Sequence, residues 1–271
     1  MMDSTTHLYG ILGNPIGHSK SPAIHNACFQ HHKINAVYLA FKIDEISKGI
    51  TALRTLNFKG ASVTIPYKKS VMEHLDWIDE DAIAIGAVNT IVNENGKLLG
   101  YNTDFKAAVT PLKSYGIKDK KICIIGAGGA AHAVAYGLQK AKGHLVIINR
   151  NQERGERLAQ KYQADFMPMD TIKTKNKINA DIVINTTSIG MSPDVQTLSF
   201  PSHHINSGMV IMDIVYTPLR TRLLVEAQKK GATTIDGLSM FLYQGAAQFK
   251  FWTGISPDIK LMRNAVRNGE S

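Results

Sequence analysis

The stretch Lys121-Ile-Cys-Ile-Ile-Gly-Ala-Gly-Gly-Ala-Ala131 decides the fold of this chain. Its first five residues form a short β-branched run that ends too abruptly for a helix, and this predicts a buried strand. Gly126, Gly128 and Ala131 follow at the spacing G-x-G-x-x-A. Such glycines let the backbone turn tightly and approach a pyrophosphate, which sits at the N-terminus of the next helix.

The elements around this turn make the motif specific. A helix is expected at 130–141, and a second strand at 145–149 follows that helix. An isolated glycine pattern is weak evidence, but a strand before it and a helix after it are what a dinucleotide-binding turn requires. We therefore predict that a cofactor binds at Gly126, Ala127, Gly128, Gly129, Ala130 and Ala131.

Strands and helices alternate from Lys121 onward. This alternation is typical of parallel βαβ crossovers in a doubly wound sheet. The expected strands are 121–125, 145–149, 181–185, 209–213 and 232–235, and the expected helices are 130–141, 152–162 and 221–230.

The residues before Lys121 predict an α/β unit of their own. Ser21 and Pro22 are typical of a helix start, with Ser21 as the N-cap and proline at the first helical position. Asn93-Glu-Asn-Gly96 predicts the turn of a hairpin. Apolar residues at helical spacing predict a helix that includes Ile46, Ile50, Leu53 and Leu56, and strands are expected at 8–13, 37–41 and 61–65.

We therefore expect an α/β protein with two domains and a cleft between them. Residues 105–238 form the Rossmann-type domain with its doubly wound parallel sheet. Residues 1–104, together with C-terminal helices in 239–271, form a substrate-binding and catalytic domain.

Composition excludes several classes of protein. The chain has 271 residues, 44% of them hydrophobic, and no run approaches the roughly 20 apolar residues that cross a bilayer. No secretory signal is visible, and ten histidines show no zinc spacing, so we expect a cytoplasmic protein without a metal. The formal charge of +9 fits either a nucleic-acid surface or anionic small ligands. Because the basic residues are scattered, we favour small ligands.

Polar side chains gather at the predicted strand ends of the first domain. Ligands bind at strand ends in such sheets, and hydroxyls, an amide, a lysine and a carboxylate suit a polyhydroxylated acid. Lysine and aspartate side chains can exchange and orient a proton. The candidates are Ser19, Ser21, Thr64, Lys68, Asn89 and Asp104.

Each of these residues also has a purely structural interpretation. Ser21 can act only as an N-cap, and Asp104 can cap a helix that begins at Phe105. Thr64 can be an ordinary strand residue, and Lys68 a solvated surface lysine. Spacing alone leaves both interpretations open.

The chain resembles the shikimate dehydrogenase family along essentially its whole length. Eight segments match in the family's order, which is far more specific than any one of them. They are Gly13-Asn-Pro-Ile-Gly-His-Ser-Lys-Ser-Pro22, Ser62-Val-Thr-Ile-Pro-Tyr-Lys68, Gly86-Ala-Val-Asn-Thr90, Gly100-Tyr-Asn-Thr-Asp104, Gly126-Ala-Gly-Gly-Ala-Ala131, Asn185-Thr-Thr-Ser-Ile-Gly-Met191, Asp213-Ile-Val-Tyr-Thr-Pro218 and Asp236-Gly-Leu-Ser-Met240 with Gln244.

The resemblance implies reversible reduction of 3-dehydroshikimate to shikimate with NADPH, in aromatic amino-acid biosynthesis. It assigns Lys68 and Asp104 as the catalytic pair, and Ser19 and Ser21 as ligands of the substrate carboxylate, with Tyr216 nearby. By the same carry-over, Thr64, Asn89, Asp104 and Gln244 bind the ring hydroxyls, and Ile214 and Gly237 lie near the nicotinamide.

The choice of dinucleotide has its own physical argument. NAD-binding sheets usually place an acid about 20 residues beyond the glycine turn, where it binds the ribose 2′-hydroxyl. Here the second strand ends in Asn149 and Arg150, and Arg154 follows. A guanidinium matches a phosphate in bidentate fashion, so this end predicts NADP. Asn151 stands where the family commonly has threonine, and its amide can still donate to phosphate.

Two alternatives to an NADP-dependent shikimate dehydrogenase remain open. One is a quinate/shikimate dehydrogenase that tolerates more substrates or NAD. The other is a non-catalytic NADP-binding sensor on the same fold, against which the presence of both Lys68 and Asp104 argues. A monomer and a homodimer are equally compatible with the sequence.

Overall fold

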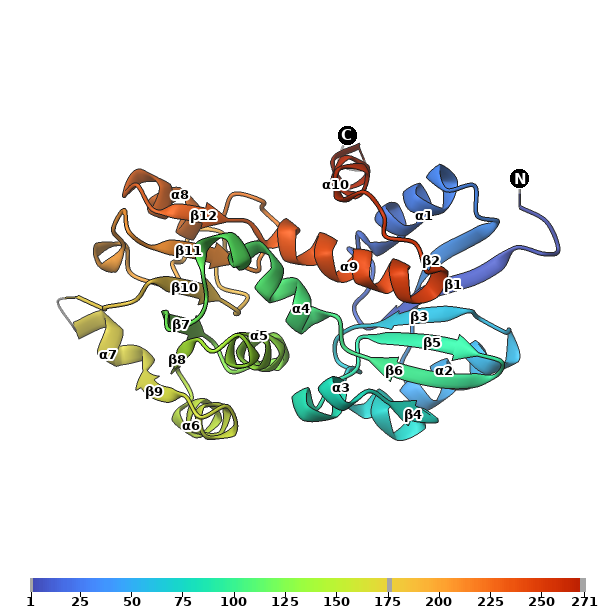
Figure 1. The fold of residues 1–271 in the computed structure, drawn as a ribbon, viewed down its shortest axis with the longest axis horizontal. Helices are drawn as coiled ribbons and strands as arrows, with labels where there is room; N and C mark the ends of the chain where they lie inside the picture. Colours follow the sequence, from blue (N-terminus) through green and yellow to red (C-terminus); the bar gives the residue numbers. More distant parts are fainter. Residues whose placement is uncertain (1, 175–176, 269–271) are drawn as a thin grey trace. The chain divides into compact units, whose positions relative to one another are not determined.

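A computed structural model describes residues 2–174 and 177–268. The chain divides into two compact units, each with its own six-stranded sheet (Figure 1). The first unit contains residues 1–103 and 242–271, and the second contains residues 104–241. The sequence-based boundaries differ slightly, because they assign Asp104 to the first unit and residues 239–241 to its C-terminal part.

The first unit is built on a mixed sheet with the strand order β2-β1-β3-β5-β6-β4. Its first three strands are parallel, whereas β5 runs antiparallel to both β3 and β6. The strands are β1 (His7–Gly13), β2 (Ala36–Lys42), β3 (Gly60–Val63), β4 (Trp77–Ile78), β5 (Thr90–Glu94) and β6 (Lys97–Tyr101).

Helical spacing of apolar residues explains how this sheet is covered. Ile46, Ile50 and Leu53 bury one face of α2 (Ile46–Thr55) in the core beneath the sheet, but Leu56 lies outside the helix and is exposed. Helix α10 (Ile259–Asn268) packs against α1 (Ser21–His31) (Figure 1). The other helical elements are the 3₁₀ turn η1 (Ser70–His74), α3 (Glu80–Ile85) and the later part of α9 (Gly237–Thr253).

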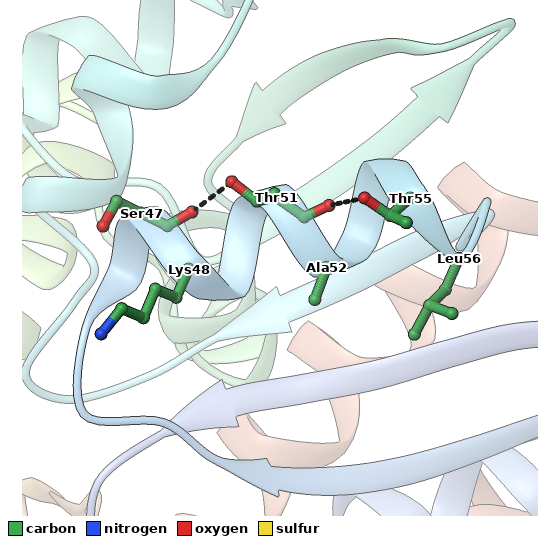
Figure 2. Close-up of a pocket in the computed structure, with 6 residues that line it drawn as sticks. All are labelled: Ser47, Lys48, Thr51, Ala52, Thr55 and Leu56. Atoms are coloured by element: carbon green, nitrogen blue, oxygen red, sulfur yellow. Dashed lines mark hydrogen bonds between the residues drawn. The ribbon is translucent and has the colours of Figure 1, made fainter.

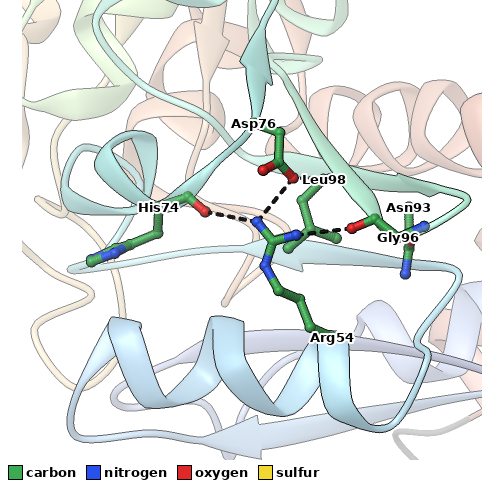
Figure 3. Close-up of polar contacts among 6 residues, drawn as sticks. All are labelled: Arg54, His74, Asp76, Asn93, Gly96 and Leu98. Carbon is green, nitrogen blue, oxygen red and sulfur yellow. Dashed lines mark hydrogen bonds and ion pairs between the residues drawn. The ribbon is translucent and has the colours of Figure 1, made fainter.

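An arginine ties the outer elements of this unit together. At the end of α2, Arg54 donates from Nη1 to the carbonyl of Gly96, 2.9 Å away, in the β5–β6 turn (Figure 3). Its Nη2 pairs with Asp76 Oδ2 at 2.9 Å, and the same oxygen accepts from the Leu98 N–H at 2.7 Å. The Leu98 N–H and then Arg54 hold the pKa of Asp76 below its usual range. The turn itself has the expected geometry, because Asn93 Oδ1 accepts from the Gly96 N–H.

The second unit is a wholly parallel sheet with the strand order β12-β11-β10-β7-β8-β9. Read from β9, with β7 counted as the first strand of the unit, this is the order 3-2-1-4-5-6 of a dinucleotide-binding doubly wound fold. The strands are β7 (Lys121–Ile125), β8 (His144–Asn149), β9 (Asp165–Pro168), β10 (Ile182–Asn185), β11 (Val210–Asp213) and β12 (Thr233–Ile235).

Helices flank these strands, and the sequence predicts those at residues 129–140, 152–161 and 222–229 to within one residue at each end. The helices are α4 (Asp104–Val109), α5 (Gly129–Lys140), α6 (Gln152–Lys161), α7 (Met169–Thr174) and α8 (Arg222–Lys229), with 3₁₀ turns η2 (Thr110–Tyr115) and η3 (Ser202–His204). Strands β7, β10 and β11 are buried along almost their whole length, which accounts for their continuous apolar runs.

Some expectations about element ends are wrong. The strand expected at 61–65 ends at Val63, because its pairing with β1 stops there and Pro66 has no N–H to continue a ladder. Four short elements, β4, α3, β9 and α7, had no prediction, since runs of two to six residues show too little periodicity.

Both cysteines lie in the core. Cys28 in α1 and Cys123 in β7 are both buried and unbridged, and burial raises the pKa of each thiol to about 11. Within residues 2–174 and 177–268, no helix has the length and apolar character needed to cross a membrane.

Candidate functional site

The turn from β7 to α5 has the shape that a dinucleotide requires. Gly126 has a φ of +110°, and a Cβ there would lie 2.7 Å from Oγ1 of Thr186, so only glycine is tolerated. Gly128 and Gly129 are exposed at the N-terminus of α5, and added Cβ atoms would meet only open space. Backbone N–H groups at this helix start can therefore be approached closely by an anion.

The end of β8 supplies positive charge beside that turn. Arg150 and Arg154 are exposed, and Asn149 donates from Nδ2 to the carbonyl of Asn151 at 2.7 Å. Asn151 is the N-cap of α6, since its Oδ1 accepts from the Arg154 N–H at 2.9 Å. Because residues 149–152 contain no acid, the arrangement fits an NADP 2′-phosphate better than a bare ribose.

A buried carboxylate organises the neighbouring strand ends. Asp213 at the end of β11 accepts from Asn185 Nδ2 at 2.9 Å, the Val215 N–H at 3.0 Å and Thr221 Oγ1 at 2.7 Å. Burial raises the pKa of Asp213, and the three donors oppose that shift. The carboxylate thereby holds the backbone of Val215 and the start of α8 at Thr221. By sequence alone, Asp213 stands out only as part of the matching segment Asp213–Pro218.

Gly237 is required by packing against that same turn. A Cβ on Gly237 would collide with the backbone of Ile214 and the carbonyl of Val215. The two residues predicted to lie near the nicotinamide, Ile214 and Gly237, are therefore in direct contact. Tyr216 stacks on Phe241 with ring centroids 5.2 Å apart, and burial raises the pKa of its phenol.

Ser19 and Ser21 meet at the start of α1. Ser21 is buried and is the first helical residue rather than the N-cap, which is Lys20. Its N–H donates to Ser19 Oγ at 3.2 Å, so the preceding serine supplies the capping hydroxyl. The predicted N-cap is thus wrong, because helical geometry begins one residue before Pro22 and places proline at the second position.

The loop after β3 is pinned to its neighbours by main-chain hydrogen bonds. The Thr64 N–H donates to the Leu12 carbonyl at 3.0 Å, and the Val88 N–H donates to the Lys68 carbonyl at 2.8 Å. Thr64 and Lys68 are both half-buried. These bonds place the predicted catalytic lysine next to the segment that carries Asn89.

Asn89 joins that segment to the residue before Asp104. Its Oδ1 accepts from the Thr103 N–H at 2.9 Å, and its Nδ2 donates to Thr103 Oγ1 at 3.0 Å. Asp104 is buried and is itself the first residue of α4, so the alternative of a cap before Phe105 does not hold. The Lys68 carbonyl is thus bound by Val88, and the residue before Asp104 is bound by the side chain of Asn89.

The predicted site residues divide between the two units. Six lie in the first unit: Ser19, Ser21, Thr64, Lys68, Asn89 and Gln244. Gln244 is half-buried on α9, one turn before the fully buried Gln248. Asp104 begins the second unit, which also holds Tyr216, Ile214, Gly237 and both cofactor segments.

A surface hollow on α2 does not contain any of these residues. It is lined by Ser47, Lys48, Thr51, Ala52 and Thr55 of α2 and by Leu56 directly after the helix (Figure 2). Two of its hydroxyls already donate to carbonyls one turn earlier in α2. Across the part of the chain that the structure describes, no group of three His, Cys, Asp or Glu side chains is placed to hold a metal ion.

The strand order, the glycine turn and the basic end of β8 define a dinucleotide-binding protein of the oxidoreductase type. Family models match three parts of the chain: the shikimate dehydrogenase substrate binding domain at residues 11–91, shikimate / quinate 5-dehydrogenase at 109–215 and the shikimate 5'-dehydrogenase C-terminal domain at 237–267.

Whole-chain relatives agree with these models. A shikimate dehydrogenase (NADP(+)) of Methanococcus maripaludis is 42% identical over 277 residues, covering 99% of each chain. A crystal structure of a shikimate dehydrogenase in complex with NADP+ has a TM-score of 0.94 at 41% identity and covers 100% of this chain and 98% of its own. The Thermus thermophilus enzyme in complex with NADP(H) and shikimate has a TM-score of 0.89 at 32% identity, covering 97% and 99%. This chain belongs to the shikimate dehydrogenase family.

Proposed function

We propose that this protein catalyses the reversible, NADPH-dependent reduction of 3-dehydroshikimate to shikimate in the cytoplasm. The observation that carries the proposal is similarity along the whole chain to relatives named shikimate dehydrogenase (NADP(+)), at 42% identity. Every residue on which the predicted chemistry depends is present in this sequence.

The substrate is proposed to bind through the polar residues of the first unit. Ser19 and Ser21 bind the carboxylate at the start of α1, where the helix dipole favours negative charge. Tyr216 is proposed to lie near the substrate carboxylate. Ring hydroxyls are bound by Thr64, Asn89, Asp104 and Gln244. Support comes from the hydrogen bonds that already hold the loops of Lys68 and Asn89 together.

Lys68 and Asp104 are proposed to stabilise the developing negative charge and to supply the proton in the reaction. NADPH supplies the hydride to the carbonyl carbon of 3-dehydroshikimate. As that bond forms, the carbonyl π electrons move to oxygen, and the Lys68 ammonium stabilises the growing negative charge. A proton then reaches the oxygen from the Lys68–Asp104 pair, giving the hydroxyl of shikimate. Asp104 orients the ammonium and a substrate hydroxyl.

The second unit is proposed to hold NADP. The pyrophosphate binds the turn Gly126–Ala131 at the N-terminus of α5, and the 2′-phosphate binds Asn149, Arg150, Asn151 and Arg154. Ile214 and Gly237 are proposed to contact the nicotinamide. Their direct packing gives the ring a rigid support.

A spectrophotometric assay tests the proposed activity. The purified protein is given shikimate and NADP+, and formation of NADPH is followed by absorbance. Quinate replaces shikimate, and NAD+ replaces NADP+, in matched reactions. Shikimate with NADP+ should give the highest kcat/KM. Faster turnover of quinate with NAD+ would instead identify a quinate dehydrogenase, and NADP+ binding without turnover of either acid would identify a sensor.

The partners are proposed to be small molecules, with no role for nucleic acid or membrane. The chain is proposed to act as a monomer or a homodimer. Light scattering after size exclusion at assay concentration distinguishes a mass of about 30 kDa from twice that value, given the chain mass of 29.7 kDa. A larger assembly would contradict both alternatives.

A further inference from the structure

A buried chain of hydroxyls and amides runs through the first unit and ends beside the predicted catalytic residues. Tyr38 donates from its hydroxyl to Ser62 Oγ at 2.7 Å, and Ser62 donates to Gln248 Oε1 at 2.9 Å. Gln248 Nε2 donates to Thr90 Oγ1 at 3.1 Å and to the Asn89 carbonyl at 3.1 Å. All five residues are at most 3% exposed, so no solvent competes for these bonds.

Thr90 connects Gln248 to the Asn89 side chain in this series of hydrogen bonds. Its hydroxyl accepts from Gln248 and donates to Asn89 Oδ1 at 2.7 Å, the shortest bond made by that oxygen. A hydroxyl has one hydrogen to donate, so accepting from Gln248 directs that hydrogen towards Asn89. Thr90 belongs to the matching segment Gly86–Thr90, yet no role in substrate binding or catalysis has been assigned to it.

The Thr90 hydroxyl fixes which way the Asn89 amide faces. Asn89 Oδ1 receives hydrogens from Thr90 Oγ1 and from the Thr103 N–H, while Nδ2 donates to Thr103 Oγ1. Rotating the amide by half a turn would bring its NH₂ against two donors. Thr90 therefore keeps Asn89 in the one orientation in which its oxygen holds the backbone immediately before Asp104.

Val88 and Asn89, the two residues directly before β5, also support the loop of Lys68. The Val88 N–H donates to the Lys68 carbonyl at 2.8 Å, and the Asn89 carbonyl accepts from the Val63 N–H at 2.9 Å. Gln248 binds that Asn89 carbonyl as well. A shift of Asn89 would thus move the supports of both predicted catalytic residues.

We propose that Thr90 is a positioning residue, which acts through Asn89 on the Lys68–Asp104 pair and on the hydroxyl-binding amide. The inference rests on the proposed shikimate dehydrogenase activity. Displacements of about 1 Å in a catalytic constellation commonly cost about a hundredfold in rate. Loss of one buried hydrogen bond should cause a smaller displacement.

Thr90→Val removes the hydroxyl while it keeps the shape of the side chain. We expect kcat/KM for shikimate to fall about tenfold, with KM for NADP+ unchanged within about twofold. Thr90→Ser returns the hydroxyl and should restore kcat/KM to within about threefold of the wild type. Ser62→Ala is the matched control: it removes a buried hydrogen bond on the far side of Gln248, and should leave kcat/KM within about twofold.

Circular dichroism and thermal unfolding of each variant keep the test independent of folding. If Thr90→Val does not fold, Thr90→Ala is assayed in its place. Equal losses for Ser62→Ala and Thr90→Val would show that the chain acts on stability alone and would overturn the proposal. So would a Thr90→Val enzyme with wild-type kcat/KM, or a Thr90→Ser enzyme as impaired as Thr90→Val. A wild-type protein without turnover would refute the proposed function instead.

Discussion

His25 makes the stability of the first unit depend on pH. It lies fully buried in α1, stacked on Tyr38 with centroids 4.5 Å apart and packed against Trp252 and Phe249. Neither ring nitrogen makes a hydrogen bond. Burial lowers the pKa of His25 from 6.5 to about 3, and the nearby Gln248 side chain opposes only part of that shift.

The sign and size of the effect follow from this shift. As pH falls below 6.5, the unfolded chain takes up a proton at His25 and the folded chain does not. The stabilisation is fully present above 6.5 and is lost progressively as pH falls towards 3. One pKa unit corresponds to about 1.4 kcal/mol, so between about pH 7.5 and pH 5 the unfolding free energy should fall by roughly 2 kcal/mol through His25 alone.

His25→Phe tests this assignment, because phenylalanine keeps the ring stack and cannot titrate. Urea unfolding is measured at about pH 7.5 and about pH 5 for the wild type, His25→Phe and a control substitution at the exposed His144. At the higher pH, His25→Phe should unfold within about 1 kcal/mol of the wild type, because the phenyl ring keeps the stack and has only one ring atom more than imidazole. At the lower pH it should retain roughly 2 kcal/mol more than either the wild type or His144→Gln. Equal losses in all three proteins would refute a neutral, buried His25.

Substitutions at three further residues test the site and its support. Lys68→Ala should lower kcat by about a hundredfold or more and leave NADP+ affinity nearly intact, since the ammonium acts only on the developing oxyanion; steady-state kinetics with near-normal turnover would remove its catalytic role. Arg150→Ala should weaken NADPH binding about tenfold and NADH binding little, because only NADPH carries the 2′-phosphate; calorimetry that shows equal losses would remove the phosphate contact. Asp213→Ala should lower the unfolding free energy by about 3 kcal/mol, because three buried donors lose their acceptor. Asp213→Asn keeps one acceptor oxygen and should lower it by about 1 kcal/mol. Denaturant unfolding curves that give the two variants the same stability would contradict the network.

The parallel sheet was predictable because its signals are local. A buried strand such as β7 shows a continuous apolar run, and Gly126 marks the turn that only glycine can make. Short elements and exact ends were not predictable. The end of β3 depends on where β1 and β5 stop pairing, and the cap of α1 depends on the path of the chain before Lys20.

The site shows the same division. Residue types, their order in the chain and the family resemblance were sufficient to predict roles for Lys68, Asp104 and the basic end of β8, because those side chains carry the chemistry themselves. No direct part in the proposed chemistry is assigned to Thr90, Gln248 or Asp213, and each has an ordinary structural interpretation when it is considered alone.

The sequence by itself determined the fold class and the family, and it predicted which groups hold a dinucleotide and a hydroxylated acid. Only the tertiary structure decided how those groups are supported. Gln248 lies 158 residues from Thr90 in the chain, and Asn185 lies 28 residues from Asp213. Hydrogen bonds between such distant residues depend on the register and packing of whole elements, whereas periodicity and turn chemistry depend only on neighbours.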